Sequence, residues 1–299
     1  MYEQISGNKR KSFFLALFFL ILIFALAWVF SELTKMGPAG LVLAVVIAVA
    51  MTFGSYYSSD KIVLAVSKAR PVTKEEYPYL YNVVEGLAIA AGLPKPRCYV
   101  IDDTAPNAFA TGRNPENSVI VVTTGILEKL NRAELEGVIA HEMSHIKNYD
   151  VLVQTLAVTM VGVVALLSDW ILRVFFWGGG RRRSSDRGKG SGNAGSIFLV
   201  VGLVLAILSP IISQLIRLAI SRKREFLADA SGALLTRYPP GLASALRKLD
   251  SDREPLEAAN KATAHLYIVN PLKEHKGRVN KLFSTHPPIE ERIAALEKM

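Results

Sequence analysis

The stretch His141-Glu142-Met143-Ser144-His145 has the pattern H-E-x-x-H and follows Arg132–Ala140, a run typical of a helix. On a helix, residues four apart share one face, so both imidazoles can point at one cation. Zinc binds imidazole nitrogen readily, and its catalytic sites use three protein ligands and a water. Glu142 stands next to the first histidine and can take a proton from that water. The stretch therefore predicts a catalytic metal site on a helix.

A metal site is not the only interpretation of two histidines, because a histidine on a helix is more often an ordinary core or surface residue. The chain has only five histidines among 299 residues. At these residue frequencies, the pattern arises by chance in on the order of one per cent of such chains or fewer. The pattern alone therefore favours the metal site.

The composition favours a membrane protein. Hydrophobic residues make up 51% of the chain, and 35 basic against 26 acidic residues give a formal charge of +9. Such a charge suits nucleic acid or an anionic membrane surface, and the long apolar runs of this chain favour the membrane over nucleic acid. Cys98 is the single cysteine, which excludes an intramolecular disulfide framework.

Four apolar runs are long enough to cross a bilayer. We expect residues 1–57 to form a membrane hairpin, with the basic stretch Lys9-Arg10-Lys11 in the cytoplasm. A signal peptide is disfavoured, because its apolar region would be unusually long and no small-residue cleavage site precedes Glu32. A second membrane pair is expected within residues 151–220. The four runs cover about residues 13–30, 38–57, 151–168 and 196–216.

The loop between the third and fourth runs conflicts with this topology. Four full crossings place residues 178–195 outside the cell, yet this Gly- and Ser-rich, flexible loop carries four arginines and a lysine against one aspartate. Basic loops tend to stay in the cytoplasm. The alternative is that the third and fourth runs form a re-entrant or interfacial pair, and we favour the full crossing.

The remaining residues predict a soluble catalytic domain in two parts, residues 58–150 and 221–299. In the first part, a capping box at Thr73–Glu76 begins a helix that ends at Gly92. Two helices are expected in the second part, at Asp252–His265 and Pro287–Lys298. Three strands are expected, the last two as a hairpin: Arg97–Ile101, Asn107–Thr111 and Ser118–Thr123. The predicted fold is mostly α with a small β-sheet, attached to four transmembrane helices.

Two histidines leave a catalytic zinc one protein ligand short. The extended pattern H-E-x-x-H-x-x-G-x-x-H does not apply, because Asn148 and Val151 stand where it needs Gly and His. Glu225 is favoured as the third ligand. It comes after the fourth apolar run, in a stretch that we expect to continue the helix of that run. Asp229, one turn later, can accept the free N–H of a ligand histidine. The other candidates are a different downstream glutamate, His265, His275 and His286.

The order of these segments places the site at the membrane. The third apolar run begins just after His145, and the fourth ends just before Glu225. Two neighbouring membrane helices would then carry the ligands on their cytoplasmic extensions. The site would face substrates that are themselves embedded in the membrane.

Four stretches together resemble the HtpX-type membrane zinc metalloproteases, which are related to the CaaX prenyl proteases. They are His141–His145, Glu225 with Asp229, Asn107–Gly112, and Ser284-Thr285-His286-Pro287-Pro288. The resemblance covers essentially the whole chain. It implies a gluzincin domain on the cytoplasmic face of a bacterial or archaeal plasma membrane. The implied role is endoproteolysis of misfolded or damaged membrane proteins, in quality control and the stress response.

The resemblance also implies a role for each site residue. His141, His145 and Glu225 would hold one zinc ion per subunit, Glu142 would be the general base, and Asp229 would hydrogen-bond a ligand histidine. His286 and Arg292 would lie near the reacting carbonyl. Without the resemblance, His286 is a turn residue, Arg292 a surface arginine, and His265 and His275 structural. An extended substrate would pair with the strand Asn107, Ala108, Phe109, Ala110 and Thr111.

Two other functions fit the same residues. One is a processing peptidase that cuts a single defined membrane substrate. The other is a membrane adaptor that does not cleave and keeps zinc for structure. A purely structural zinc site uses four protein ligands and has no need of a general base beside them. The presence of Glu142 next to His141 therefore favours an enzyme over the adaptor. The partners expected for the enzyme are the lipid bilayer and membrane-protein or unfolded polypeptide substrates.

Overall fold

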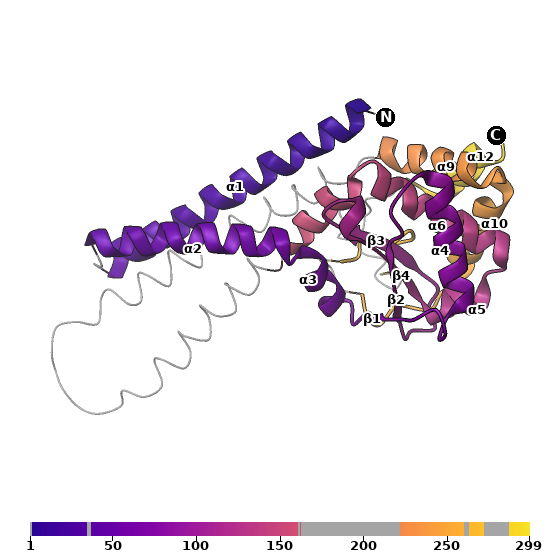
Figure 1. The fold of residues 1–299 in the computed structure, drawn as a ribbon, viewed down its shortest axis with the longest axis horizontal. Coiled ribbons are helices and arrows are strands. Elements are labelled where there is room, and N and C mark those ends of the chain that lie inside the picture. The colour runs from indigo at the N-terminus through magenta and orange to yellow at the C-terminus, as the bar shows by residue number, and fades with distance from the viewer. Residues whose placement is uncertain (1, 35–36, 161, 163–221, 260–262, 272–286) are drawn as a thin grey trace.

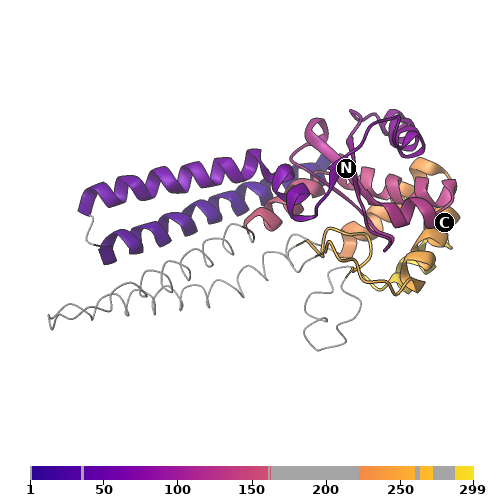
Figure 2. The same ribbon diagram turned by 90° about the horizontal axis from the view of Figure 1, so that it is seen from below.

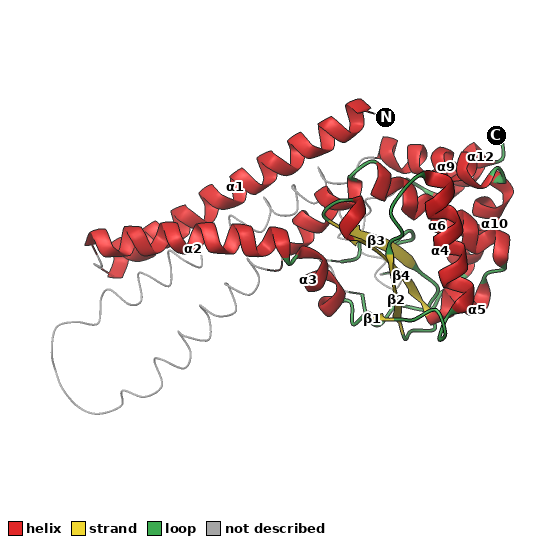
Figure 3. Ribbon diagram, in the orientation of Figure 1, coloured by secondary structure: helices red, strands yellow, loops and turns green. Residues whose placement is uncertain are grey.

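A computed structural model describes residues 2–34, 37–160, 162, 222–259, 263–271 and 287–299, and the structure of the protein is given for these residues. They form a mostly helical protein with one small mixed sheet (Figures 1 and 3). The strands are β1 (Arg70–Pro71), β2 (Arg97–Ile101), β3 (Ala108–Gly112) and β4 (Ser118–Thr123). The helices are α1 (Tyr2–Thr34), α2 (Gly37–Tyr57), α3 (Ser59–Val66), α4 (Pro78–Ala91), α5 (Thr124–Lys129), α6 (Arg132–Lys147), an unlabelled helix Asp150–Met160, α9 (Arg222–Thr236), α10 (Pro239–Ser251) and α12 (Ile289–Leu296).

The sheet has the order β1-β2-β4-β3, which leaves β3 at an edge. Strands β2 and β4 are parallel, and β3 and β4 are antiparallel across the turn Pro115–Asn117, which confirms the predicted hairpin. Strands β2 and β4 have the predicted bounds, and β3 begins one residue later than predicted.

Strand β4 lies in the middle of the sheet and is buried on both faces. Successive side chains of a strand point to opposite faces, so Ile120 and Val122 face one core while Val119 and Val121 face another. The first core is closed by α4, α6, α10 and α12, and the second by α3 and by the segment that contains Tyr267. The run Val-Ile-Val-Val is therefore apolar at every position because both of its faces are covered.

Helix α4 shows the predicted capping residues in a different place. The Thr73 N–H donates to Glu76 Oε2 (2.9 Å) and the Glu76 N–H to Thr73 Oγ1 (3.4 Å), but these bonds close a turn ahead of the helix. The helix starts at Pro78, whose fixed φ suits a first helical position. It ends as predicted at Gly92, which is left-handed with φ 65°.

The predicted helix Asp252–His265 is wrong over its described residues. Residues 252–256 are irregular, and 257–258 and 263–265 form turns. Pro255 disfavours helical geometry at the residue before it, and the Glu257 N–H donates to Asp103 Oδ2 (3.0 Å) instead of to a helical carbonyl. Helix α12 lies inside the predicted helix Pro287–Lys298.

Helices α1 and α2 run side by side and extend away from the part that holds the sheet (Figures 1 and 2). The start of the third apolar run, Asp150–Met160, packs against them through Leu152, Leu156 and Met160. Among the described residues, α2 is the one helix that passes a test of length and hydropathy for crossing a membrane. The rest of the third run from residue 163, and the whole of the fourth, lie outside the described residues.

Candidate metal centre

Helix α6 carries the H-E-x-x-H stretch and is fixed at its start by a capping box. Asn131 accepts from the Glu134 N–H (3.0 Å), and Glu134 accepts from the Asn131 N–H (2.8 Å). Glu134 also accepts from Ser244 (2.6 Å) and Lys248 (2.7 Å) on α10. Burial alone would raise the pKa of Glu134, but these donors outweigh it and lower the pKa. The box thus fixes both where α6 begins and how it sits on α10.

Helix α9 approaches α6 closely at Gly232. A Cβ placed on Gly232 would lie 3.0 Å from the backbone nitrogen of His141 and 3.2 Å from the Cα of His141. The absence of a side chain therefore lets the two helix backbones approach at the first histidine. Asp229 and Glu225 lie three and seven residues earlier on the same helix, so they face α6 as well.

Gly232→Ala is expected to destabilise the protein by about 1–3 kcal/mol, because the added methyl group overpacks the contact between α9 and α6. It should also weaken metal binding, since α9 carries Glu225. Thermal unfolding in detergent and zinc competition would measure both effects. Gly86→Ala is the control. Gly86 lies on α4, a methyl group added there has no atom within 4 Å, and the change should stabilise the protein by up to about 1 kcal/mol. Equal behaviour of the two variants would contradict this account of Gly232.

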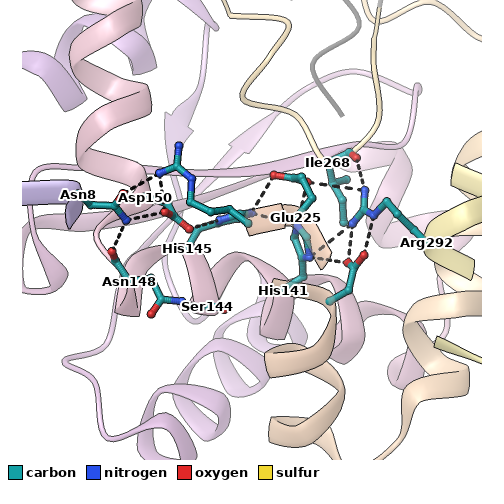
Figure 4. Close-up of polar contacts among 11 residues, drawn as sticks. Asn8, His141, Ser144, His145, Asn148, Asp150, Glu225, Ile268 and Arg292 are labelled. Carbon is teal, nitrogen blue, oxygen red and sulfur yellow. Dashed lines mark hydrogen bonds and ion pairs between the residues drawn. The ribbon is translucent and has the colours of Figure 1, made fainter. Parts of the chain in front are cut away.

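Three predicted ligands meet between α6 and α9 (Figure 4). His141, His145 and Glu225 each offer one ligand atom, and these atoms lie within 4.8 Å of one another. The two Nε2 atoms are 3.2 Å apart, and Glu225 Oε2 and Oε1 lie 3.8 Å from His141 Nε2 and 3.6 Å from His145 Nε2. All three residues are buried. Two imidazoles and one carboxylate form a donor set that suits a catalytic zinc ion.

Each histidine has its other ring nitrogen held by a carboxylate. His141 Nδ1 is 2.9 Å from Asp229 Oδ1, and His145 Nδ1 is 2.9 Å from Asp150 Oδ2. Such partners fix the tautomer and leave Nε2 free to bind a metal. Asp229 was predicted from the sequence and Asp150 was not. The signal for Asp150 was a carboxylate five residues after His145, where the chain leaves α6.

Arg292 is fully buried, so its interpretation as an ordinary surface arginine is wrong. Its Nε and Nη2 donate to Asp229 Oδ2 (2.8 Å) and Oδ1 (2.7 Å), and Nη1 donates to the Ile268 carbonyl (3.1 Å). Burial alone would raise the pKa of Asp229, but Arg292 and then His141 outweigh it and lower the pKa. Arg292 thus lies beside His141 Nδ1 (3.5 Å from Nη2), and its Nη1 also lies 3.9 Å from Glu225 Oε2. Through Asp229, Arg292 can position the imidazole of His141.

Arg292→Lys is expected to weaken zinc binding about 10–100-fold, as is typical when a group that orients a ligand is altered. Lysine cannot reproduce the two parallel bonds that the guanidinium makes to Asp229. With zinc at saturation, kcat should fall less than the affinity does. Arg132→Lys, at an exposed position of α6, is the control. Full zinc affinity with a large loss of kcat would instead support the role implied by the resemblance.

Glu142 is buried, and its carboxylate accepts a hydrogen bond from the Ala110 backbone on β3. Burial raises the pKa of Glu142, and Glu225 adds to this rise; His141, His145 and the Ala110 N–H oppose it without cancelling it. A carboxylate with a raised pKa is a better general base near neutral pH.

The predicted substrate strand lies at the sheet edge with some of its groups already engaged. Phe109 packs edge-on against Tyr267, and Thr111 Oγ1 lies 3.0 Å from Thr155 Oγ1. The Ala108 carbonyl accepts from the Ile268 N–H (3.0 Å). Main-chain groups two residues apart point the same way, so those of Ala110 also face away from β4. Asn107 donates from Nδ2 to the Val269 carbonyl (2.9 Å).

Of the other three histidines, His265 is the one that lies among the described residues. His265 is buried but does not belong to the cluster, which within the described ranges consists of two histidines and one glutamate. His275 and His286 lie outside the described residues, and so does the predicted pairing of His286 with Arg292.

The chain matches the model of peptidase family M48 over residues 74–299. It is 51% identical over 298 residues to a Protease HtpX homolog of Dictyoglomus turgidum, covering 100% of this chain and 94% of that one. It is 45% identical to a Protease HtpX homolog of Thermoanaerobacter pseudethanolicus, covering 100% and 98%.

A solved structure shares the fold. The crystal structure of S. mikatae Ste24p superposes with a TM-score of 0.52 at 22% identity, covering 99% of this chain and 66% of that one. The match to the family model covers most of the chain and includes both halves of the candidate metal centre. The chain therefore belongs to peptidase family M48 and is a metalloprotease.

Proposed function

We propose that this protein is an integral-membrane zinc endopeptidase that cuts misfolded or damaged membrane proteins at the cytoplasmic face of the plasma membrane. The observation that carries the proposal is the position of the metal centre. The helix Asp150–Met160 begins five residues after His145 and packs against α1 and α2. The candidate ligands therefore lie where the catalytic part meets the apolar helices.

The surfaces of α1 and α2 support a place in the bilayer. Large apolar side chains on both helices are exposed, in a region where water would make such exposure costly. Phe13 is 63% exposed, Val42 65% and Phe53 61%. Lys9, Arg10 and Lys11 precede the apolar part of α1, as expected for a cytoplasmic end. In this proposal all four apolar runs, about 13–30, 38–57, 151–168 and 196–216, cross the membrane.

The chemistry is peptide-bond hydrolysis by His141, His145, Glu225 and Glu142. Zinc held by the first three would polarise the scissile carbonyl and lower the pKa of a water toward about 7. Glu142 accepts the proton of the attacking water and returns it to the leaving amine. Asp229 and Asp150 keep both imidazoles in the tautomer that presents Nε2.

The sheet edge suggests how an extended substrate is held. The main chain of Ala110 faces away from β4, and its N–H reaches Glu142. A substrate strand that pairs beside Ala110 would place its peptide bonds next to the general base. Main-chain pairing depends little on side-chain identity, which suits substrates recognised by being unfolded.

The test is cleavage by the purified full-length protein in proteoliposomes. The substrates are a destabilised membrane-protein variant, its stable parent, and a soluble unfolded protein. We expect several cuts in the destabilised variant, loss of cleavage after chelation, and recovery on adding zinc. A single cut in one substrate would favour the processing peptidase. Full zinc occupancy with no cleavage of any substrate would favour the adaptor.

The cytoplasmic orientation can be tested by cysteine labelling. Ile89 is 76% exposed on α4, so Ile89→Cys offers a reactive thiol on the catalytic part. The native Cys98 is buried, and burial raises its pKa to about 11, so it should react slowly. A membrane-impermeant maleimide should label Ile89→Cys only after the cells are opened. Labelling in intact cells would show that the catalytic part lies on the outer side of the membrane and would contradict the proposed orientation.

A further inference from the structure

Asn8 is a buried polar residue in a helix that is otherwise largely apolar. It lies near the start of α1 and is 4% exposed, although the sequence around it is polar and basic. A buried amide is costly unless its donors and its acceptor are all satisfied. Its partners therefore show what holds this end of α1 in place.

The side-chain amide of Asn8 has a partner for each of its polar functions (Figure 4). Nδ2 donates to the Asn148 carbonyl and to Asp150 Oδ1, both at 2.7 Å. Oδ1 accepts from Arg224 Nη1 at 2.9 Å. The two N–H groups meet two acceptors and the oxygen meets a cation, so the orientation of the amide is fully determined.

Asp150 connects this amide to the metal centre. Its Oδ1 accepts from Asn8 and from Arg224 (2.8 Å), while its Oδ2 lies 2.9 Å from His145 Nδ1. One oxygen is thus held by α1 and α9, and the other holds a candidate ligand. Asp150 is 2% exposed, so water does not substitute for these donors.

The two carboxylates behind the ligand histidines are held from different places. Asp229 is held by Arg292 of α12, within the catalytic part. Asp150 is held in part by a residue 142 positions earlier, in the first apolar helix. The contact of α1 with the rest of the protein therefore includes a direct connection to His145.

We propose that Asn8 is a positioning residue that couples the packing of α1 to metal binding. By holding Asp150, Asn8 fixes the tautomer and direction of the His145 imidazole. Displacing the start of α1 would remove one of the two donors to Asp150 Oδ1, leave Arg224 as the other, and weaken the metal site without any contact between α1 and the metal. This inference rests on the proposed zinc site at His141, His145 and Glu225.

The test is zinc affinity of the full-length protein in detergent, by competition with a chelator, together with the visible spectrum of the Co²⁺ form. Asn8→Ala should lower zinc affinity about 10–100-fold, the range for groups that orient ligands, and should change the Co²⁺ bands. Asn8→Asp keeps the volume and removes both donors, so it should act in the same direction. Ser12→Ala, at a buried position one turn later on α1, is the matched control and should change affinity less than twofold.

A double-mutant cycle separates positioning from general damage to α1. If Asn8 acts through Asp150, Asn8→Ala should have almost no further effect on zinc affinity in an Asp150→Ala background. An equal loss in both backgrounds would overturn the proposal, as would wild-type affinity in Asn8→Ala and Asn8→Asp. If the wild type binds zinc and the Asn8 variants bind it with the same affinity, the coupling alone is overturned. A wild type that binds no zinc overturns the proposed function as well.

Discussion

Replacing Glu142 by glutamine is expected to lower kcat about 10²–10⁴-fold, the usual contribution of a positioned general base. Glutamine is nearly isosteric and can occupy the buried site beside Ala110, but it cannot accept the proton of an attacking water. The ligands His141 and His145 are unchanged, so zinc content should stay at the wild-type level. Initial rates of cleavage and metal analysis of the same samples would measure both quantities.

Glu136→Gln is the matched control for this prediction, because Glu136 lies on the same helix and pairs with the exposed Arg132. It should retain wild-type rates. Cleavage by Glu142→Gln at the control rate would remove Glu142 from the proposed chemistry. Loss of zinc from Glu142→Gln would show that Glu142 supports metal binding. We do not expect this result, because Glu142 is not among the three residues of the ligand cluster.

Replacing Glu225 by alanine is expected to lower zinc affinity on the order of 100-fold or more, beyond the effect of altering groups that only orient ligands. The change removes the only candidate ligand contributed by α9 and leaves two imidazoles on α6. Zinc retained after dialysis, and affinity by chelator competition, would measure the loss. Activity should fall in parallel and recover in part at high zinc concentration.

Leu234→Ala controls for damage to α9, since this side chain is 78% exposed on the same helix. It should bind zinc as the wild type does. Equal zinc affinity in Glu225→Ala and Leu234→Ala would remove Glu225 as a ligand. Among the candidates named from the sequence, attention would then move to the histidines after α10.

Features that depend on local sequence were predictable. The motif His141–His145 and the run Arg132–Ala140 before it both lie within α6, because capping residues and the spacing of apolar side chains act within a few residues. The hairpin of β3 and β4 was predictable for the same reason. The meeting of Glu225 with His141 and His145 was anticipated because a catalytic zinc site with two histidines requires a third ligand.

Features that depend on distant contacts had no signal in the residues themselves, and Arg292 was named as a site residue only through the family resemblance. Arginine is almost never fully buried unless it is paired, and nothing near Arg292 in the sequence announces its pairing with Asp229, 63 positions away. Asp150 and Asn8 have no pattern that connects them, because their contact exists only once α1 packs against the catalytic part. The predicted helix Asp252–His265 failed for a related reason, since contacts to Asp103 replaced helical bonds.

The burial of Arg292 also has a consequence for the order of events in folding. Arg292 comes 151 residues after His141, on the last helix to leave the ribosome among those described. Until α12 docks, Asp229 lacks the guanidinium that binds both of its oxygens, so the carboxylate beside His141 is held less firmly. A growing chain would therefore hold an incomplete metal centre beside its own unfolded segments. Self-cleavage during synthesis would be disfavoured until α12 has been made and has docked.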